Sequence, residues 1–341
     1  LKKARQQLKT YRQAVLKHAF EGKLTEKWRE QQTDFEPAEK LLEKIKAERQ
    51  RRYEKQLKEW EKAVKQWEAD GKSREKPKKP QKPKELPELT DDELKELPEL
   101  PEGWEWEKHQ NISEINIRPD FYRVEDNVDV SFLRMAKVEE ISGKIHLDET
   151  KKFGEVKKGY TPFVNRDIIF AKITPCMENG KFAVVDNLLN GIGFGSTEFH
   201  VSRLTKYSYP YFYFYYFSQT SFRREAQRNM TGSAGQLRVP TNYFKEVSVP
   251  ICTFQEQHQI VQEIEQRLSV ADNLEKSIED SLKKAEALRQ SILKQAFEGK
   301  LTEAWRKKHP ELVSGENSAE RLLERIKEEK ESASQKTNKK R

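Results

Sequence analysis

The chain has 341 residues, of which 35% are hydrophobic and 36% are charged, and its formal net charge is +8. This composition excludes one compact globule of that length and suits a modest globular domain joined to long, solvent-exposed helices. No stretch reaches the roughly 18 apolar residues of a membrane span, and the positive charge permits nucleic-acid binding without identifying it.

The chain opens with an expected helix that stops just before Gly22. Its apolar residues recur at alternating steps of three and four, which is the a/d pattern of a coiled coil. Gly22 follows the last periodic turn, where a left-handed C-cap is expected. The periodic residues are Leu1, Ala4, Leu8, Tyr11 and Val15.

Both ends of the chain carry a copy of the same sequence, which includes the eight residues AFEGKLTE. Residues 12–29 and 289–306 share fourteen of eighteen positions, and residues 38–49 and 319–330 share eight of twelve. Two copies are too few for a solenoid, whose stacked units number about three or more. We call them the first and second repeat copies, and interpret them as a duplicated end-piece arranged around a two-fold axis.

The conserved part of each copy continues beyond its helix stop. A plain stop explains Gly22 and Gly299 but not the recurrence of the residues that follow them, up to Trp28 and Trp305. We therefore predict that the stop and its tryptophan present a docking surface.

A charged segment follows the first copy. Glu48–Ala69 is helical by propensity, with apolar residues along one side. Lys72–Lys84 holds seven basic residues, one Glu and three prolines, which is typical of a solvated, polyproline-like linker. A nuclear signal or a heparin patch is the alternative for such a run, and a spacer is favoured. Thr90 with Asp91–Leu94 is expected to start a short helix.

The pattern of the chain predicts an α+β fold. Its central segment, residues 100–253, is expected to form a mixed α/β domain around an irregular, strongly bent sheet, and long coiled-coil helices are expected on both sides of this domain. The dense aromatic run Tyr207–Phe222 could stack on bases, but core packing is favoured, with Pro210 placed to begin a helix. The β-prone runs are Phe132–Val138, Gly143–His146, Asp167–Ile173, Lys181–Asp186 and Thr197–Arg203.

A long helix is expected after the central domain. No Pro or Gly occurs between Gln255 and Glu298, so a single helix of about 65 Å is predicted. Polar residues interrupt its heptad pattern at Arg267 and Ser281. The apolar heptad residues are Ile264, Ala271, Leu274, Ile278, Ala285, Leu288 and Ile292.

Signatures of an enzyme are missing from the sequence. The glycine-rich run at residues 191–196 lacks the Lys-Ser/Thr and the strand–loop–helix frame of a phosphate loop, and is interpreted as a turn or bulge. The Asn-Pro-Pro-aromatic motif of adenine methyltransferases does not occur, and the histidines have no ligand spacing. His200 is predicted to be structural. Cys176 and Cys252 form no metal motif, and a reducing cytosol is the default location.

Three polar, glycine-containing segments remain as candidate readers of DNA bases: residues 171–181, 193–200 and 229–240. Glycine allows close backbone approach, while Arg, Lys, Gln, Asn, Ser and Thr bond to base edges and phosphates. Ordinary polar turns are the alternative, and composition alone leaves it open. The predicted DNA-binding residues are Lys172, Thr174, Asn179, Lys181, Ser196, Thr197, Arg228, Thr231, Ser233, Gln236 and Arg238.

From Leu1 to about Lys330 the chain resembles the specificity (S) subunit of type I restriction-modification enzymes. The duplicated ends, of the type LRQxILxxAFEGKL, carry much of the resemblance. Several long matches in the same order on one chain make it specific. The other matching stretches are LPEGWEW at 100–106, ITPCMENGK at 173–181, GSTEFHV at 195–201, GSAGQ at 232–236 and VPICTFQEQHQIV at 249–261.

The resemblance implies a non-catalytic subunit with two target recognition domains, each reading half of a split DNA site, joined by antiparallel helices. The helices bind two methyltransferase (M) subunits. The family complex uses S-adenosylmethionine, and with a motor–nuclease (R) subunit also ATP and Mg²⁺, whereas no cofactor is expected on this chain. The predicted partner-binding residues are Phe20, Leu24, Trp28, Phe297, Leu301 and Trp305.

The chain holds one recognition domain where the family has two. Either another domain precedes Leu1 or the chain is a half-subunit that pairs with itself, and the start inside a heptad run favours the former. A coiled-coil adaptor with a β-rich binding domain is the alternative function, and a stand-alone nuclease or methyltransferase is disfavoured. The expected segments are two repeat regions at 1–49 and 254–330, a charged helix and linker at 50–99, the recognition domain at 100–253 and a polar tail at 331–341.

Overall fold

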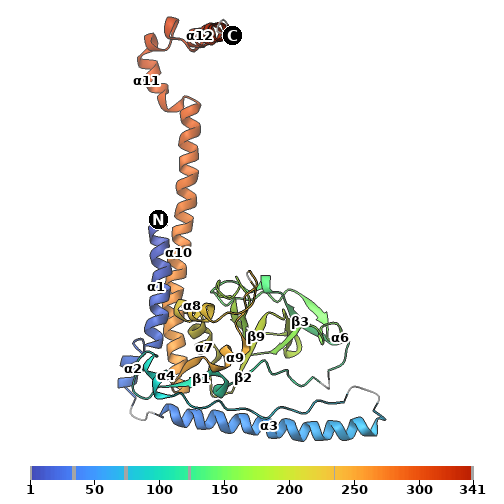
Figure 1. Ribbon diagram of the computed structural model, residues 1–341. Helices are drawn as coiled ribbons and strands as arrows, with labels where there is room; N and C mark the ends of the chain where they lie inside the picture. Colours follow the sequence, from blue (N-terminus) through green and yellow to red (C-terminus); the bar gives the residue numbers. More distant parts are fainter. Residues whose placement is uncertain (1, 33–35, 73–75, 122–123, 234, 339–341) are drawn as a thin grey trace. The chain divides into compact units, whose positions relative to one another are not determined.

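A computed structural model describes residues 2–32, 36–72, 76–121, 124–233 and 235–338 (Figure 1). The chain divides into two compact units, each described by itself below. The large unit comprises Gln6–Ala271, and the small unit comprises Leu1–Arg5 together with Asp272–Arg341.

Helices at the two ends of the large unit lie side by side (Figure 1). The first is α1 (Lys2–Phe20), and the second is the start of α10 (Phe254–Phe297), whose bounds match the predicted helix to within one residue. Both contribute to the core of the unit, through Phe20 and Ile264 among others. The first repeat copy continues through α2 (Glu26–Glu30) and α3 (Ala38–Ala69). Since α3 runs on through residue 50, no structural break separates the first two predicted segments.

Short strands build the central domain as three sheets within the described residues. One pairs β1 with β10, the second has the order β2-β9-β6-β7, and the third has the order β4-β3-β8-β5. All pairs are antiparallel except β3 with β8. The strands are β1 (Glu105–Lys108), β2 (Ser113–Ile115), β3 (Asp129–Leu133), β4 (Thr150–Lys152), β5 (Thr161–Val164), β6 (Ile168–Ala171), β7 (Phe182–Val184), β8 (Ile192–Gly195), β9 (Phe199–Leu204) and β10 (Ser248–Ile251).

The predicted strands are partly confirmed. Two of the five β-prone runs contain a whole strand, β6 or β7, and two overlap part of β3 or β9, but Gly143–His146 was predicted wrongly. There, Ile145 forms a single bridge with Val138, and Gly143 has a φ of +70° that turns the chain out of an extended path. The glycine-rich run interpreted as a turn is also different, because Ile192–Gly195 is strand β8 in the interior of a sheet. A Cβ at Gly193 would lie 2.2 Å from the Phe163 ring, so the strand uses glycine to admit that ring.

The aromatic run forms a core helix, as predicted. Helix α7 (Pro210–Phe217) begins with Pro210 at its first turn and buries most of its rings. Phe212 and Phe217 are fully buried, so these rings serve packing and are not available for stacking on bases. The other short helices are α4 (Asp91–Lys95), which Thr90 caps as expected, α5 (His109–Ile112), α6 (Phe153–Val156), α8 (Thr220–Arg228) and α9 (Thr241–Glu246), with 3₁₀ turns at Met135–Lys137 and Leu189–Gly191.

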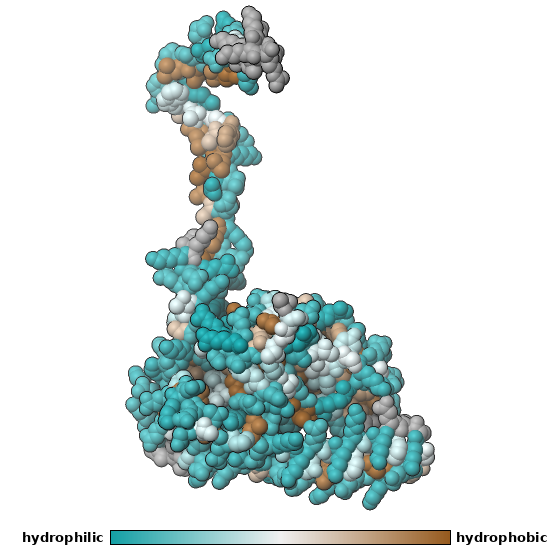
Figure 2. All heavy atoms as spheres, viewed as in Figure 1, coloured by the Kyte–Doolittle hydropathy of each residue, from teal (hydrophilic) through white to brown (hydrophobic). Residues whose placement is uncertain are grey.

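The small unit contains the second repeat copy on the distal part of α10, on α11 (Glu303–Lys308) and on α12 (Ala319–Asn338). Several of its large apolar residues are exposed: Leu288 is 62% exposed and Phe297 is 92% exposed. Figure 2 shows apolar side chains gathered along this part of α10. The connecting 3₁₀ turns are Lys300–Thr302, Pro310–Leu312 and Gly315–Asn317.

Two buried histidines should make the stability of the large unit depend on pH. Burial lowers the pKa of both His109 and His200 to about 4, below the usual value near 6.5, so both are neutral in the folded chain. Their contribution to the free energy of unfolding is complete above about pH 6.5 and is lost as the pH falls toward 4. At pH 5 the loss is on the order of 2 kcal/mol for each histidine. Urea titrations at pH 7 and pH 5 should show this loss. His109→Gln should flatten the pH dependence, and a variant with the same pH profile as the unchanged chain would contradict the assignment.

Candidate nucleic-acid interface

The three predicted polar segments meet in space, although they are distant in sequence. Lys172 is the centre of this meeting point. Its backbone N–H donates to the carbonyl of Glu198 at 2.9 Å, and its carbonyl accepts from Val239 N–H at 2.8 Å. Thr174 N–H also donates to the Leu237 carbonyl at 3.0 Å. Backbone hydrogen bonds therefore join all three segments into one surface.

The predicted DNA-binding residues differ in how far they are exposed. Each is either exposed or half-buried, so none is lost to the core. The half-buried residues are Lys172, Thr174, Lys181, Ser196 and Arg238. The exposed residues are Asn179, Thr197, Arg228, Thr231, Ser233 and Gln236.

Several of these side chains already have partners within the chain. The Lys181 ammonium donates to the Met135 carbonyl at 3.3 Å, and Asn179 Nδ2 donates to a Glu140 carboxylate at 2.8 Å. Lys181 therefore supports the turn, while the Asn179 carbonyl oxygen stays available as an acceptor. Residues with uncommitted polar groups are the better candidates for contacts with a ligand.

An ion pair that the sequence did not reveal lies at the centre of the surface. Arg238 donates from Nε and Nη2 to the two carboxylate oxygens of Glu198, each at 2.9 Å. The Arg238 hydrogen bond lowers the pKa of Glu198, and the same bond raises the pKa of Arg238. Glu198 lies in the turn between β8 and β9, 40 residues from Arg238, so only the folded register brings the pair together.

A buried histidine supports the segment that carries Arg238. His200 on β9 donates from Nε2 to the Val239 carbonyl at 2.9 Å and accepts at Nδ1 from Asn116 Nδ2 at 3.0 Å. Arg238 itself bridges to Ile173 and Thr231. The predicted structural role of His200 is confirmed, since the ring is 1% exposed and hydrogen-bonded through both nitrogens.

The surface offers hydrogen-bond donors and acceptors. Across the described residues, no three His, Cys, Asp or Glu side chains gather as a metal site would require. Burial raises the pKa of the thiols of Cys176 and Cys252, which disfavours a reactive thiolate. The donor set suits base edges and phosphate oxygens, the groups that polar side chains and backbone amides contact on DNA.

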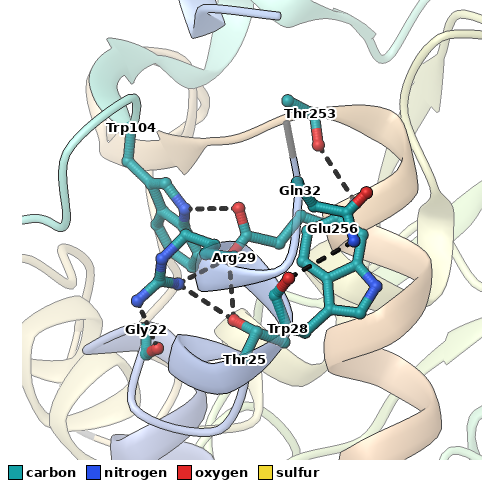
Figure 3. A network of polar contacts seen from close by, with 8 residues as sticks. All are labelled: Gly22, Thr25, Trp28, Arg29, Gln32, Trp104, Thr253 and Glu256. Carbon is teal, nitrogen blue, oxygen red and sulfur yellow. Dashed lines mark hydrogen bonds and ion pairs between the residues drawn. The ribbon is translucent and has the colours of Figure 1, made fainter. Parts of the chain in front are cut away.

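A second polar site anchors the first repeat copy to the central domain (Figure 3). Glu256, at the start of α10, is fully buried. Its Oε1 accepts from Thr25 Oγ1 at 2.7 Å and from Arg29 Nη1 at 2.6 Å, and its Oε2 accepts from Trp104 Nε1 at 2.8 Å. Two distant segments, residues 25–29 and Trp104, thus converge on one carboxylate of α10. The sequence signal was the recurrence of this Thr and Arg in both copies, as Thr302 and Arg306.

The predicted partner-binding residues differ between the copies. Phe20 is 6% exposed and meets Phe212 and Tyr216 edge-on, with ring centroids at 5.1 and 5.2 Å. Phe20 therefore packs against its own domain and is not accessible to a separate subunit, which corrects its assignment as a docking residue. Leu24 packs against the same core, and Trp28 is half-buried. The second-copy residues Phe297, Leu301 and Trp305 are 92%, 54% and 48% exposed.

Known proteins resemble this chain over most of its length. Residues 101–284 match a family model described as the type I restriction modification DNA specificity domain. The chain is 36% identical over 290 residues to the type I restriction enzyme EcoAI specificity subunit of Escherichia coli, covering 84% of this chain and 44% of that protein. It is 33% identical over 288 residues to the EcoEI specificity subunit of Escherichia coli, covering 84% of this chain and 43% of that protein. This chain therefore spans less than half the length of these two relatives.

Solved structures give a weaker likeness. A crystal structure of the HsdS subunit from Thermoanaerobacter tengcongensis aligns with a TM-score of 0.40 at 16% identity, covering 77% of this chain and 56% of that one. None of the helices in the described ranges is long and apolar enough to span a membrane.

Proposed function

Because the chain belongs to the type I restriction-modification DNA specificity family, we propose that its large unit reads one half of a split DNA target and carries out no reaction itself. The observation that carries this proposal is the convergence of residues 171–181, 193–200 and 229–240 on one accessible polar surface. Such a surface supplies direct contacts to base edges and positioning contacts to phosphates.

The helices would connect this reader to the rest of a restriction-modification complex. We assign the exposed second-copy residues Phe297, Leu301 and Trp305 to docking of a methyltransferase subunit, because large apolar side chains gathered on a surface mark an interaction site. A DNA-methylating complex would use S-adenosylmethionine, and a motor–nuclease subunit would add a requirement for ATP and Mg²⁺. These cofactors would be held by the partner subunits, and the reaction would take place in the cytoplasm.

Alanine replacement in the third polar segment tests the function. The variant Thr231→Ala, Ser233→Ala, Gln236→Ala should weaken binding and methylation of the target by the complex with methyltransferase subunits, by about 10-fold or more, since each lost base contact costs about 1–3 kcal/mol. These side chains are exposed, so the fold should persist. The measurement is the DNA-binding affinity and methylation rate of the complex on target and scrambled duplexes.

A matched control lies on α10, where Ser277→Ala, Ser281→Ala, Gln290→Ala removes the same kinds of group from exposed positions. This control variant should keep wild-type affinity and discrimination between duplexes. If the segment variant and the control behave alike, the polar surface does not read DNA. If the wild-type complex shows no sequence-dependent DNA binding at all, a protein–protein adaptor becomes the better description.

A further inference from the structure

The guanidinium of Arg238 has a defined set of occupied and unoccupied donors. Of its five N–H groups, Nε and Nη2 each donate one to Glu198, and Nη1 donates one to the Gln236 carbonyl at 3.1 Å. One N–H therefore remains on each of the two Nη nitrogens. Glu198 takes the edge formed by Nε and Nη2, so the edge formed by Nη1 and Nη2 faces away from it, on a side chain that is 40% exposed.

Both members of the ion pair are held by the surrounding backbone. Arg238 exchanges two backbone hydrogen bonds with Thr231, at 2.8 and 2.9 Å. The Glu198 N–H donates to Ser196 Oγ at 3.2 Å, and its carbonyl accepts from Lys172 N–H. The carboxylate therefore orients the guanidinium from a fixed position. A reader prepared in this way loses less rotamer entropy when a ligand binds.

Stability alone gives a weak reason for this arrangement. Both side chains are partly solvated, at 40% and 24% exposed, and an ion pair between solvated side chains contributes little to stability. The more specific consequence of the Arg238–Glu198 ion pair is that it fixes the orientation of the two Nη nitrogens of Arg238. A planar pair of N–H donors matches two acceptors side by side, and in the major groove guanine presents such a pair at O6 and N7. Adenine presents an amino donor where guanine has O6, so the same fork mismatches it.

Resting on the proposed function, we propose that Arg238 reads the guanine of one G·C pair in the major groove and that Glu198 is its positioning residue. Glu198 consumes the Nε edge of the guanidinium and leaves the Nη edge for the base. The half-site read by this chain therefore contains a G·C pair whose guanine contacts Arg238. The phosphate backbone is the other group that accepts a two-pronged donor, and the experiment distinguishes the two.

The test uses the complex of this chain with its methyltransferase subunits. Mapping methylated sites in the DNA of cells that express the complex gives the target, and duplexes changed at one base pair then give the preference at each position. Arg238→Ala should lower affinity for the intact target by about 10-fold or more and remove the preference at one G·C position, while the other positions keep theirs. Arg238→Lys should retain part of that preference.

A modified base separates a base contact from a phosphate contact. Replacing the guanine at that position with 7-deazaguanine removes the N7 acceptor, which should weaken binding by the wild-type complex and leave binding by the Arg238→Ala complex unchanged. Glu198→Gln should weaken binding less than Arg238→Ala and retain the G·C preference, because the fork remains but is held less firmly. Glu198→Asp should recover part of that loss, since it restores a carboxylate.

Two results would overturn the inference while leaving the proposed function intact. In the first, the wild-type complex discriminates between sequences, but Arg238→Ala weakens binding to every sequence equally. The slope of log affinity against log salt concentration also falls by about one, which identifies a phosphate contact. In the second, Arg238→Ala and Glu198→Gln leave the base preferences unchanged, which makes the pair structural. A wild-type complex without sequence discrimination would instead remove the proposed function, and this inference with it.

Discussion

Replacing Arg29 with methionine is expected to lower the free energy of unfolding of the large unit by about 3–5 kcal/mol. The Glu256 carboxylate is fully buried, and Arg29 is the cation that the structure places beside it, at 2.6 Å. Removing the cation leaves a buried negative charge whose other partners, Thr25 and Trp104, are neutral. Urea unfolding followed by far-UV circular dichroism and tryptophan fluorescence measures the loss.

The second repeat copy provides the matched control. Arg306 occupies the position equivalent to Arg29 and makes the equivalent bond to a glycine carbonyl, 2.6 Å to Gly299 against 2.7 Å to Gly22. Arg306→Met should therefore change the free energy of unfolding by less than about 1 kcal/mol, as exposed substitutions usually do. A double variant that also carries Glu256→Gln should be less destabilised than the two single losses added together. Equal effects at Arg29 and Arg306 would show that Glu256 does not depend on its cation.

The recurrence of Thr25 and Arg29 in both copies is visible in the sequence, but their buried partner could not have been found from it, for a physical reason. Glu256 meets Arg29 across 227 residues and Trp104 across 152, and nothing in local composition distinguishes it from the other acidic residues of α10. The bounds of α10 itself followed from local features, namely the absence of Pro and Gly and a sustained heptad pattern. Local signals thus defined the element, while the role of one residue in it depended on the tertiary fold.

The candidate interface shows the same division. Side-chain chemistry and glycine content led to the prediction that Gln236 and Arg238 contact DNA, and the structure leaves Gln236 exposed and Arg238 half-buried. Glu198 was not selected because an acidic residue is not expected to contact DNA, and because its ion pair with Arg238 forms only when the turn after β8 meets the third segment. Strand β8 was missed because Gly193 and Gly195 resemble a turn, although a larger residue would collide with Phe163. Packing against a distant ring outweighed local propensity there.

The last prediction compares Phe20 and Phe297, which occupy equivalent positions in the two repeat copies but lie in different environments. Phe20→Ala should destabilise the large unit by about 3–5 kcal/mol, because it opens a cavity and removes two edge-to-face ring contacts. Phe297→Ala should leave the free energy of unfolding nearly unchanged, since that ring is 92% exposed.

Assembly should show the opposite order. Phe297→Ala is expected to weaken capture of methyltransferase subunits several-fold in a pull-down with the folded chain, because a large exposed apolar ring contributes mainly when a partner covers it. A Phe297→Ala chain that assembles normally would exclude this ring from docking. A Phe20→Ala chain of unchanged stability would contradict the packing of the first repeat copy against its domain. The unfolding and binding measurements together distinguish Phe20, which stabilises the fold, from the equivalent Phe297, which is expected to bind a partner subunit.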